Sequence, residues 1–385
     1  MDDTGFLKKG THSVGVARQY CGPVGKQDNC RVAVSLSVAT HDAASLPIAW
    51  RLYLPESWAS DRERRKATGV PEEIRFQTKP AMALAQIRQA VEQGVPPAPV
   101  LADSAYGKET RFREGITELE LPYGVGVHEN MTVWPPGEVP RPKHRRKGRG
   151  RPPTRLHRDG KPAPVAVKDL ALGLPEQAWK TVIGREGTRH KLKSCFAAVR
   201  VRPAHRDEKR SEPYPEEWLL LEGPAGEPEP TQYWLSTLPA NTRLTALVRL
   251  AKRRWIIERD YEERKQELGW GHYEGRGWRG FPHHATLCIA AYGFLVIERS
   301  RFSPSARGGR LELRAAKIPP QFQPPRLAAR APNGITRSRS PRSASKLPAP
   351  CSSSYRAVRF VARAVYNTVV LAGTSRSSSR SRRFG

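Results

Sequence analysis

Residues 254–284 read RWIIERDYEERKQELGWGHYEGRGWRGFPHH, and the predictions of fold and function start from this stretch. Glu258, Tyr261 and Lys265 recur at intervals of three and four residues, so they share one stripe of a helix. Arg254 lies one turn before Glu258. A carboxylate can hold a metal ion and flanking cations can hold a polyanion, so the stripe suits chemistry on a phosphate backbone. A solvated helix with ion pairs between successive turns is the alternative interpretation.

The charge of the chain indicates its class of partner. The formal net charge of +29 over 385 residues points to a polyanion, most simply nucleic acid. From Arg301 to the end, 18 Lys and Arg residues stand against one acid, so this part supplies +17 of the total. It is rich in Ser, Pro and Arg and has few aliphatic runs to offset ordering entropy. We therefore predict that residues 319–385 form a disordered basic tail.

Cysteine usage and hydropathy bear on the compartment. None of the five cysteines forms a CxxC pair, so the sequence predicts neither a zinc site nor a disulfide framework. No signal peptide opens the chain. Ala285–Val296 predicts a buried core helix that is too short to span a membrane. We expect a cytoplasmic protein with no membrane partner.

Two further acidic positions lie near predicted strands. Met1 leads directly into Asp2-Asp3-Thr4-Gly5, which we interpret as the end of a strand that enters a turn. Val100–Ala102 predicts a short apolar strand that ends at Asp103, after a predicted helix over Lys79–Gln93. A helix, a strand and an acid at the strand's carboxyl end are typical of α/β sheets, whose ligands gather at that edge.

Alternating apolar residues predict the remaining strands. They lie at Arg31–Ala39, Leu46–Leu54, Leu121–His128, Gln177–Val182, Lys191–Val201, Trp218–Leu221 and Gln232–Ser236. Thr245–Leu268 is expected to form one long helix. We therefore predict five segments, namely a first part of a catalytic core over 1–134, a basic linker over 135–165, a β-rich insertion over 166–240, a last part of the core over 241–318, and the tail.

Asp3, Asp103 and Glu258 together fit two-metal phosphoryl transfer. Such sites take carboxylates from separate elements around two divalent ions about 4 Å apart, one beside the attacking oxygen and one beside the leaving oxygen. Spacings of 100 and 155 residues separate the three acids, so the sequence does not show whether they meet. For Asp2 and Asp3 taken alone, a turn or helix-capping carboxylate is the competing interpretation.

The order of these blocks resembles bacterial insertion-sequence transposases of the DDE class that carry the Y-R-E-K signature, Tyr-x2-Arg-x3-Glu-x6-Lys. Arg254, Glu258 and Lys265 fit the last three letters, whereas the tyrosine position falls on Ala251. The resemblance covers about residues 1–315.

The two aspartates of the signature are matched by position. Asp3, within DDTGFLKKG, matches the family's first acid, because the family places this acid directly before Thr. Asp2 is the competing candidate. Asp103, within LADSAYG, matches the second acid.

The resemblance implies an RNase H-like α/β fold, in which a mixed sheet is flanked by helices and carries a β-rich insertion. It implies a DNA transposase that uses two Mg²⁺ or Mn²⁺ ions to cleave strands at transposon ends and to join a 3′-hydroxyl to target DNA. Asp3, Asp103 and Glu258 would be the catalytic metal ligands, and Arg254 and Lys265 would contact DNA. The implied partners are double-stranded DNA, both terminal inverted repeats and target, and a second copy of the chain. The implied location is the bacterial cytoplasm, at the nucleoid.

A basic run supplies a second candidate DNA contact. Arg141–Arg155, RPKHRRKGRGRPPTR, carries eight Lys and Arg residues and no acid. Its centre resembles an AT-hook, so Arg149 and Arg151 are candidates for insertion into a narrow A·T minor groove. A linker that binds DNA backbone without selectivity is the alternative.

The family carries DNA-end-binding helices before its first acid. We therefore expect that this chain lacks the beginning of a family member, that Asp3 sits on a frayed terminus, and that the tail is out of frame. The alternative function is a catalytically inactive transposase remnant that binds DNA non-specifically by charge.

Overall fold

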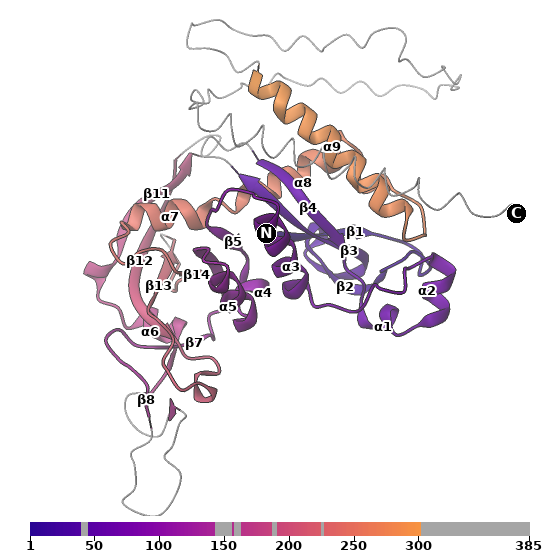
Figure 1. Cartoon of the computed structure of the whole chain (residues 1–385). Helices are drawn as coiled ribbons and strands as arrows, with labels where there is room; N and C mark the ends of the chain where they lie inside the picture. The colour runs from indigo at the N-terminus through magenta and orange to yellow at the C-terminus, as the bar shows by residue number, and fades with distance from the viewer. Residues whose placement is uncertain (40–44, 143–155, 158–162, 187–190, 225–226, 302–385) are drawn as a thin grey trace, which may run out of the picture.

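The computed structural model describes residues 1–39, 45–142, 156–157, 163–186, 191–224 and 227–301 (Figure 1). The AT-hook candidates Arg149 and Arg151 and the predicted tail over 319–385 lie outside these residues. The described part contains two larger sheets with helices packed around them, so the predicted α/β architecture is confirmed.

The first sheet is built on β3 (Lys26–Ala39), which is the longest strand described. β1 (Asp2–Leu7), β2 (Ala17–Cys21) and β4 (Ser45–Leu52) all pair with it antiparallel. Residues 30–35 of β3 are all buried, so both faces of this strand are covered at its centre.

The start of the chain differs from the prediction. Every residue of β1 is paired, from Asp2 opposite Ser35 to Leu7 opposite Cys30. Asp2 is 8% exposed and Phe6 is buried. The interpretation of residues 2–5 as a strand end entering a turn, and of Asp3 as part of a frayed terminus, is therefore wrong. The apolar anchor of the strand follows the acids, at Phe6, instead of preceding them.

The second sheet has eight strands and is mixed. Its order is β10-β7-β12-β13-β14-β6-β5, and β11 pairs with β12. β5 and β6 are parallel, and the other pairings are antiparallel. The bounds are β5 (Val100–Ala102), β6 (Tyr123–Val127), β7 (Thr132–Trp134), β10 (Val165–Ala166), β11 (Lys180–Glu186), β12 (Lys191–Pro203), β13 (Glu217–Gly223) and β14 (Gln232–Ser236). The strands of the predicted insertion thus extend the sheet that begins with β5 and β6. A separate pair joins β8 (Arg141–Pro142) to β9 (Leu156–His157).

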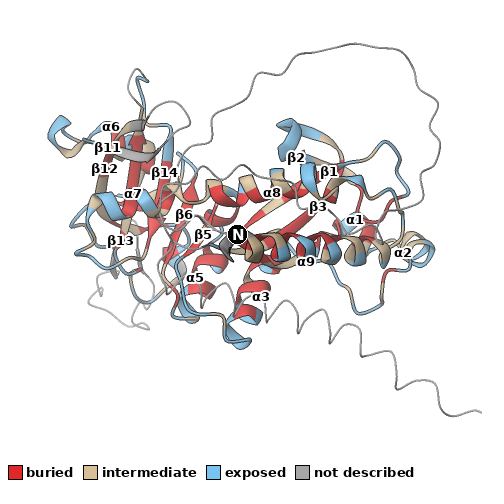
Figure 2. Cartoon of the chain, turned by 90° about the horizontal axis from the view of Figure 1, so that it is seen from above, coloured by how far each residue is buried: buried red, intermediate tan, exposed pale blue. Residues whose placement is uncertain are grey.

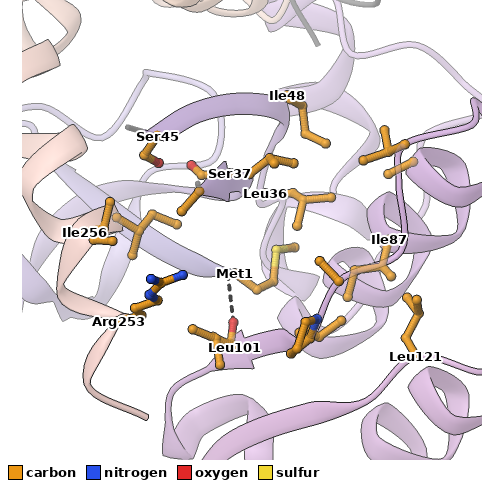
Figure 3. A pocket seen from close by; sticks show the side chains of 18 of the residues that line it. Met1, Leu36, Ser37, Ser45, Ile48, Ile87, Leu101, Leu121, Arg253 and Ile256 are labelled. Atoms are coloured by element: carbon orange, nitrogen blue, oxygen red, sulfur yellow. Dashed lines mark hydrogen bonds between the residues drawn. The ribbon is translucent and has the colours of Figure 1, made fainter. Parts of the chain in front are cut away.

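The two sheets meet at Met1. Its ammonium group donates a hydrogen bond of 2.8 Å to the carbonyl oxygen of Leu101 in β5 (Figure 3). A cavity of 440 Å³ opens beside this contact, between apolar side chains that include Leu36, Ile87 and Ile256. Arg253 and Arg254 also line it. The cavity is apolar, so it is a gap between the sheets and not the place where the acids gather.

Helices cover the two sheets. α3 (Lys79–Glu92), α4 (Ser104–Gly107) and α5 (Thr110–Glu118) share one buried apolar cluster with β5 and β6. α1 (Glu56–Ala59), α2 (Arg62–Thr68) and α6 (Val167–Leu172) are shorter. Figure 2 shows buried residues along the central strands and exposed residues around α2 and β2.

The predicted helix over Thr245–Leu268 is two helices. α7 (Leu244–Lys252) ends and α8 (Trp255–Glu267) begins at a turn formed by Arg253 and Arg254. The amides of Ile256 and Ile257 bond three residues back, to Arg253 and Arg254, so the helical hydrogen bonding tightens at this turn. Apolar periodicity continues through such a turn, which explains why the pattern predicted one helix.

α9 (Gly280–Arg301) is the longest helix described, with 22 residues, and it exceeds the predicted Ala285–Val296. Residues Gly280–Glu298 are long and apolar enough to cross a membrane by length and composition. A core helix of a soluble protein passes the same test, and α9 packs Phe281, Ala285 and Cys288 into a cluster with β1 and α8.

Candidate active site

The alternation of β1 decides which acid faces α8. Asp2 and Thr4 point to one face of the strand, where Asp2 Oδ2 accepts 2.7 Å from Arg254 Nη1 and Thr4 Oγ1 accepts 2.7 Å from Lys265 Nζ. Phe6 lies on this face too, edge-on to Trp270. The first residue of β1 is therefore placed against the helix that carries the Arg-Glu-Lys pattern.

Asp3 points to the opposite face. Its Oδ2 accepts a hydrogen bond of 3.2 Å from the Tyr106 hydroxyl and forms an ion pair of 3.1 Å with Lys79. Tyr106 lies on α4 and Lys79 begins α3, so both partners of Asp3 Oδ2 come from other elements than α8. Because the strand has a period of two, Asp2 and Asp3 face opposite sides of β1, and Asp2 is the one that contacts Arg254. The preference for Asp3 as the first catalytic acid stays a prediction.

Asp103 stands at the junction of β5 and α4. Its Oδ1 accepts from the amides of Ala105, at 3.0 Å, and Tyr106, at 3.3 Å, so it caps α4. Burial raises the pKa of Asp2, and the negative charge of Asp103 adds to this rise. The strand end and the cap hold Asp103 beside β1.

Glu258 lies on the first turn of α8 and reaches the other acids through Arg254. Arg254 Nη2 donates to Glu258 Oε1 at 2.6 Å, while its Nη1 donates to Asp2. The side chains of Asp2, Arg254 and Glu258 are 12%, 30% and 55% exposed. The ion pair of Arg254 with Asp2 is therefore largely buried, and its ion pair with Glu258 is open to solvent. One guanidinium group therefore bridges two of the acids.

Burial dominates the electrostatics of this cluster. It raises the pKa of Asp2 to about 7, even though the positive charge of Arg254 lowers it. Burial also lowers the pKa of the Met1 ammonium group to about 6. A buried carboxylate is ionised more readily when a cation lies beside it, and the charges of Arg254 and of the Met1 ammonium group both favour the ionised form of Asp2.

The carboxylates of Asp2, Asp103 and Glu258 have the chemistry to bind a divalent ion, but in this structure they are not placed to share one. Carboxylate oxygens are the ligands that Mg²⁺ and Mn²⁺ prefer. Among the described residues, however, no three His, Cys, Asp or Glu side chains are grouped so that they could hold one ion. Arg254 bridges Asp2 and Glu258, and Asp103 acts on Arg254 through its charge.

Lys265 is engaged with β1. Its ammonium group donates to Thr4 Oγ1 at 2.7 Å and to the Gly5 carbonyl at 3.0 Å, and it lies 5.1 Å from the Phe6 ring centroid. Burial lowers the pKa of Lys265 to about 8. A DNA contact by this side chain would require it to leave these partners.

Some residues of the site were not found from the sequence. Tyr106 and Lys79 bind Asp3, and the Tyr261 hydroxyl lies 2.7 Å from Ser35 Oγ on β3. Tyr106 follows Asp103 in the SAYG turn, so its closeness in sequence to a candidate acid could have indicated it. Lys79 opens α3 and has no signal, because only the tertiary packing brings it to β1. Ala251, at the signature's tyrosine position, is buried on α7.

Parts of the chain are similar to known proteins. Residues 1–191 match the family described as DDE superfamily endonuclease. The chain is also similar to a protein of Microchaete diplosiphon described as a probable transposase for insertion sequence element IS701, with 34% identity over 134 residues. That match covers 34% of this chain and 32% of the relative, so the similarity spans about a third of the relative's length.

The matched residues include Asp2, Asp3 and Asp103, whereas Glu258 lies beyond them. The third acid therefore rests on the Arg254-Glu258-Lys265 spacing and on the contacts of α8. Family membership, the α/β fold and the contacts of the acids all agree. Residues 1–191 place the chain in the DDE superfamily of endonucleases, and about a third of the chain is similar to an insertion-sequence transposase.

Proposed function

We propose that this chain catalyses metal-dependent cleavage of DNA strands at transposon ends and their transfer into target DNA. The observation that carries the proposal is the convergence of β1, β5 and α8, which brings Asp2, Asp103 and Glu258 around Arg254. Membership of the DDE superfamily supports a requirement for divalent metal ions. Mg²⁺ or Mn²⁺, as a pair of ions, would activate the attacking oxygen and stabilise the leaving oxygen.

We propose Asp2, Asp103 and Glu258 as the residues that hold the metal, with Asp2 in place of Asp3. Asp2 shares its face of β1 with α8, whereas Asp3 is bound to Tyr106 and Lys79. Asp103 is fixed by its cap on α4. Glu258 is the most exposed of the three and can turn toward the other two.

The DNA contacts follow from charge. Arg254 lies at the acids and is 30% exposed, so it can reach a phosphate beside the reacting bond. We retain Lys265, Arg149 and Arg151 as proposed DNA contacts, in which Lys265 would first leave Thr4 and Gly5. We further propose that the substrate is double-stranded DNA with terminal inverted repeats, that two copies act on paired ends, and that the chain acts at the bacterial nucleoid.

The test uses purified full-length chain with Mg²⁺ and a DNA duplex bearing the element's own terminal repeats. Nicking at the repeat ends is expected, and Asp103→Asn and Glu258→Gln should lower its rate by at least about a hundredfold, because each removes a metal ligand worth several kcal/mol in the transition state. DNA binding should survive in both variants. Salt-sensitive DNA binding without any nicking would instead indicate a remnant that binds by charge.

The choice between the two neighbouring aspartates is tested in the same assay. Asp2→Asn should abolish nicking, whereas Asp3→Asn should retain most of it, since only Asp2 faces α8. Both substitutions keep shape and remove one charge, so each is the matched control of the other. Loss of nicking in Asp3→Asn with full activity in Asp2→Asn would reverse the assignment.

A further inference from the structure

Arg254 bridges two of the acids proposed to hold metal. Its two terminal nitrogens donate to Asp2 Oδ2 at 2.7 Å and to Glu258 Oε1 at 2.6 Å. The other oxygen of Asp2, Oδ1, accepts from the Asp3 amide at 2.9 Å. Both oxygens of Asp2 are therefore in use, one of them by a cation.

A guanidinium and a divalent ion at the same carboxylate oxygens would repel each other. The site is half-buried, with Asp2 only 12% and Arg254 30% exposed, so water screens this repulsion poorly. Asp103 adds a further negative charge near Arg254. In this conformation Arg254 supplies the neutralising charge that the acids require.

We propose that Arg254 is an internal placeholder for the metal. It stabilises the free site, it has to leave Asp2 and Glu258 when divalent ions are bound, and its freed guanidinium then binds a DNA phosphate. The inference rests on the proposed function and adds a coupling to it. Because one side chain is shared between the acids and DNA, DNA that draws Arg254 away strengthens metal binding, and metal strengthens DNA binding by the same factor.

The experiment measures Mn²⁺ binding to the full chain by electron paramagnetic resonance, with and without a short DNA duplex. In Arg254→Gln, Mn²⁺ should bind more tightly without DNA than in the unsubstituted chain, by about 5- to 150-fold, the usual range of such couplings. The DNA duplex should raise the Mn²⁺ affinity of Arg254→Gln less than that of the unsubstituted chain, and the difference should be the same factor. Arg249→Gln is the matched control, because Arg249 is an exposed cation on α7, apart from Asp2 and Glu258.

Weaker or unchanged Mn²⁺ binding in Arg254→Gln would overturn the inference, because it would make Arg254 an organiser of the ligands or a bystander. Arg254→Lys keeps the positive charge but cannot donate to Asp2 and Glu258 through two separate nitrogens. Its affinity for Mn²⁺ should therefore lie between that of the unsubstituted chain and that of Arg254→Gln. Thermal unfolding identifies a variant that fails to fold. If Arg254→Gln fails to fold, Arg254→Lys replaces it in the test. Tighter Mn²⁺ binding by Arg254→Lys than by the unsubstituted chain supports the inference, and equal or weaker binding overturns it. Failure of the proposed function has another signature, namely Mn²⁺ binding that is unaffected by Asp2→Asn and Asp103→Asn.

Discussion

Neighbouring residues of one strand have different environments in this protein. Asp2 and Asp3 are chemically identical, yet Asp2 is bound to Arg254 on α8 and Asp3 to Tyr106 and Lys79. The period of two along β1 separates them, and no property of either residue alone does so. The environment of Lys265 is likewise decided by its neighbours. Its position on the helical stripe suggests a surface cation, yet its ammonium group donates hydrogen bonds to Thr4 and Gly5.

The Lys265 ammonium group predicts a dependence of stability on pH. Its folded pKa of about 8 lies below the ordinary value of 10.5, so between these values the unfolded chain binds more protons and stability rises with pH. Lys265→Met should lack this rise. A shift of this size corresponds to about 3 kcal/mol at full burial, and partial exposure reduces the expected difference to about 1–2 kcal/mol. Urea unfolding at pH 7.5 and at pH 10 measures it, and equal pH dependence in both proteins would contradict the burial of Lys265.

At the scale of elements, short segments position the acids. α4 has only four residues, yet Asp103 caps it and Gly107 lets it lie against β6. A β-carbon on Gly107 would collide with the carbonyl oxygen of Gly126 and come within 3.0 Å of Val125 Cβ. The position of Asp103 therefore depends on a close approach between a helix and a strand.

Gly107→Ala should consequently destabilise the protein by about 3 kcal/mol, because backbone atoms of β6 cannot move aside as a flexible side chain can. It should also lower Mn²⁺ binding, since Asp103 moves with α4. Gly10→Ala is the control: a β-carbon there meets nothing within 4 Å, so its effect should stay within about 0.5 kcal/mol. Urea unfolding compares the two, and similar losses would exclude the close approach as the cause.

At the scale of the whole molecule, two sheets and a large positive charge are combined. Strands far apart in sequence, β1 and β5, meet at Met1 and Leu101, and α8 lies over β1. The chain as a whole carries a formal charge of +29, whereas the candidate site is made of acids. The acids and the cations are interleaved, because Glu258 and Lys265 share α8 and Arg254 at its start bridges Asp2 and Glu258.

The overall charge predicts how DNA binding responds to salt. If the chain neutralises about 6–10 phosphates, its affinity for duplex DNA should fall by about 10³- to 10⁵-fold between 50 and 200 mM salt. The slope should be the same in Asp103→Asn and Glu258→Gln, because counterion release depends on the bound cations and not on the catalytic acids. Fluorescence anisotropy measures the slope. Affinity independent of salt would show that charge is not the main source of binding.

The sequence by itself predicted the family, the α/β class, most strands and α3, and it singled out Asp103 and Glu258 as candidate acids. These follow from local periodicity and spacing, which the chain carries without its fold. The tertiary structure alone decided that β1 is fully paired, that α7 and α8 are separate, that Asp2 faces α8, and that Arg254 bridges Asp2 and Glu258. The physical reason is that these features depend on contacts between residues up to 252 positions apart, whose partners a local pattern does not specify.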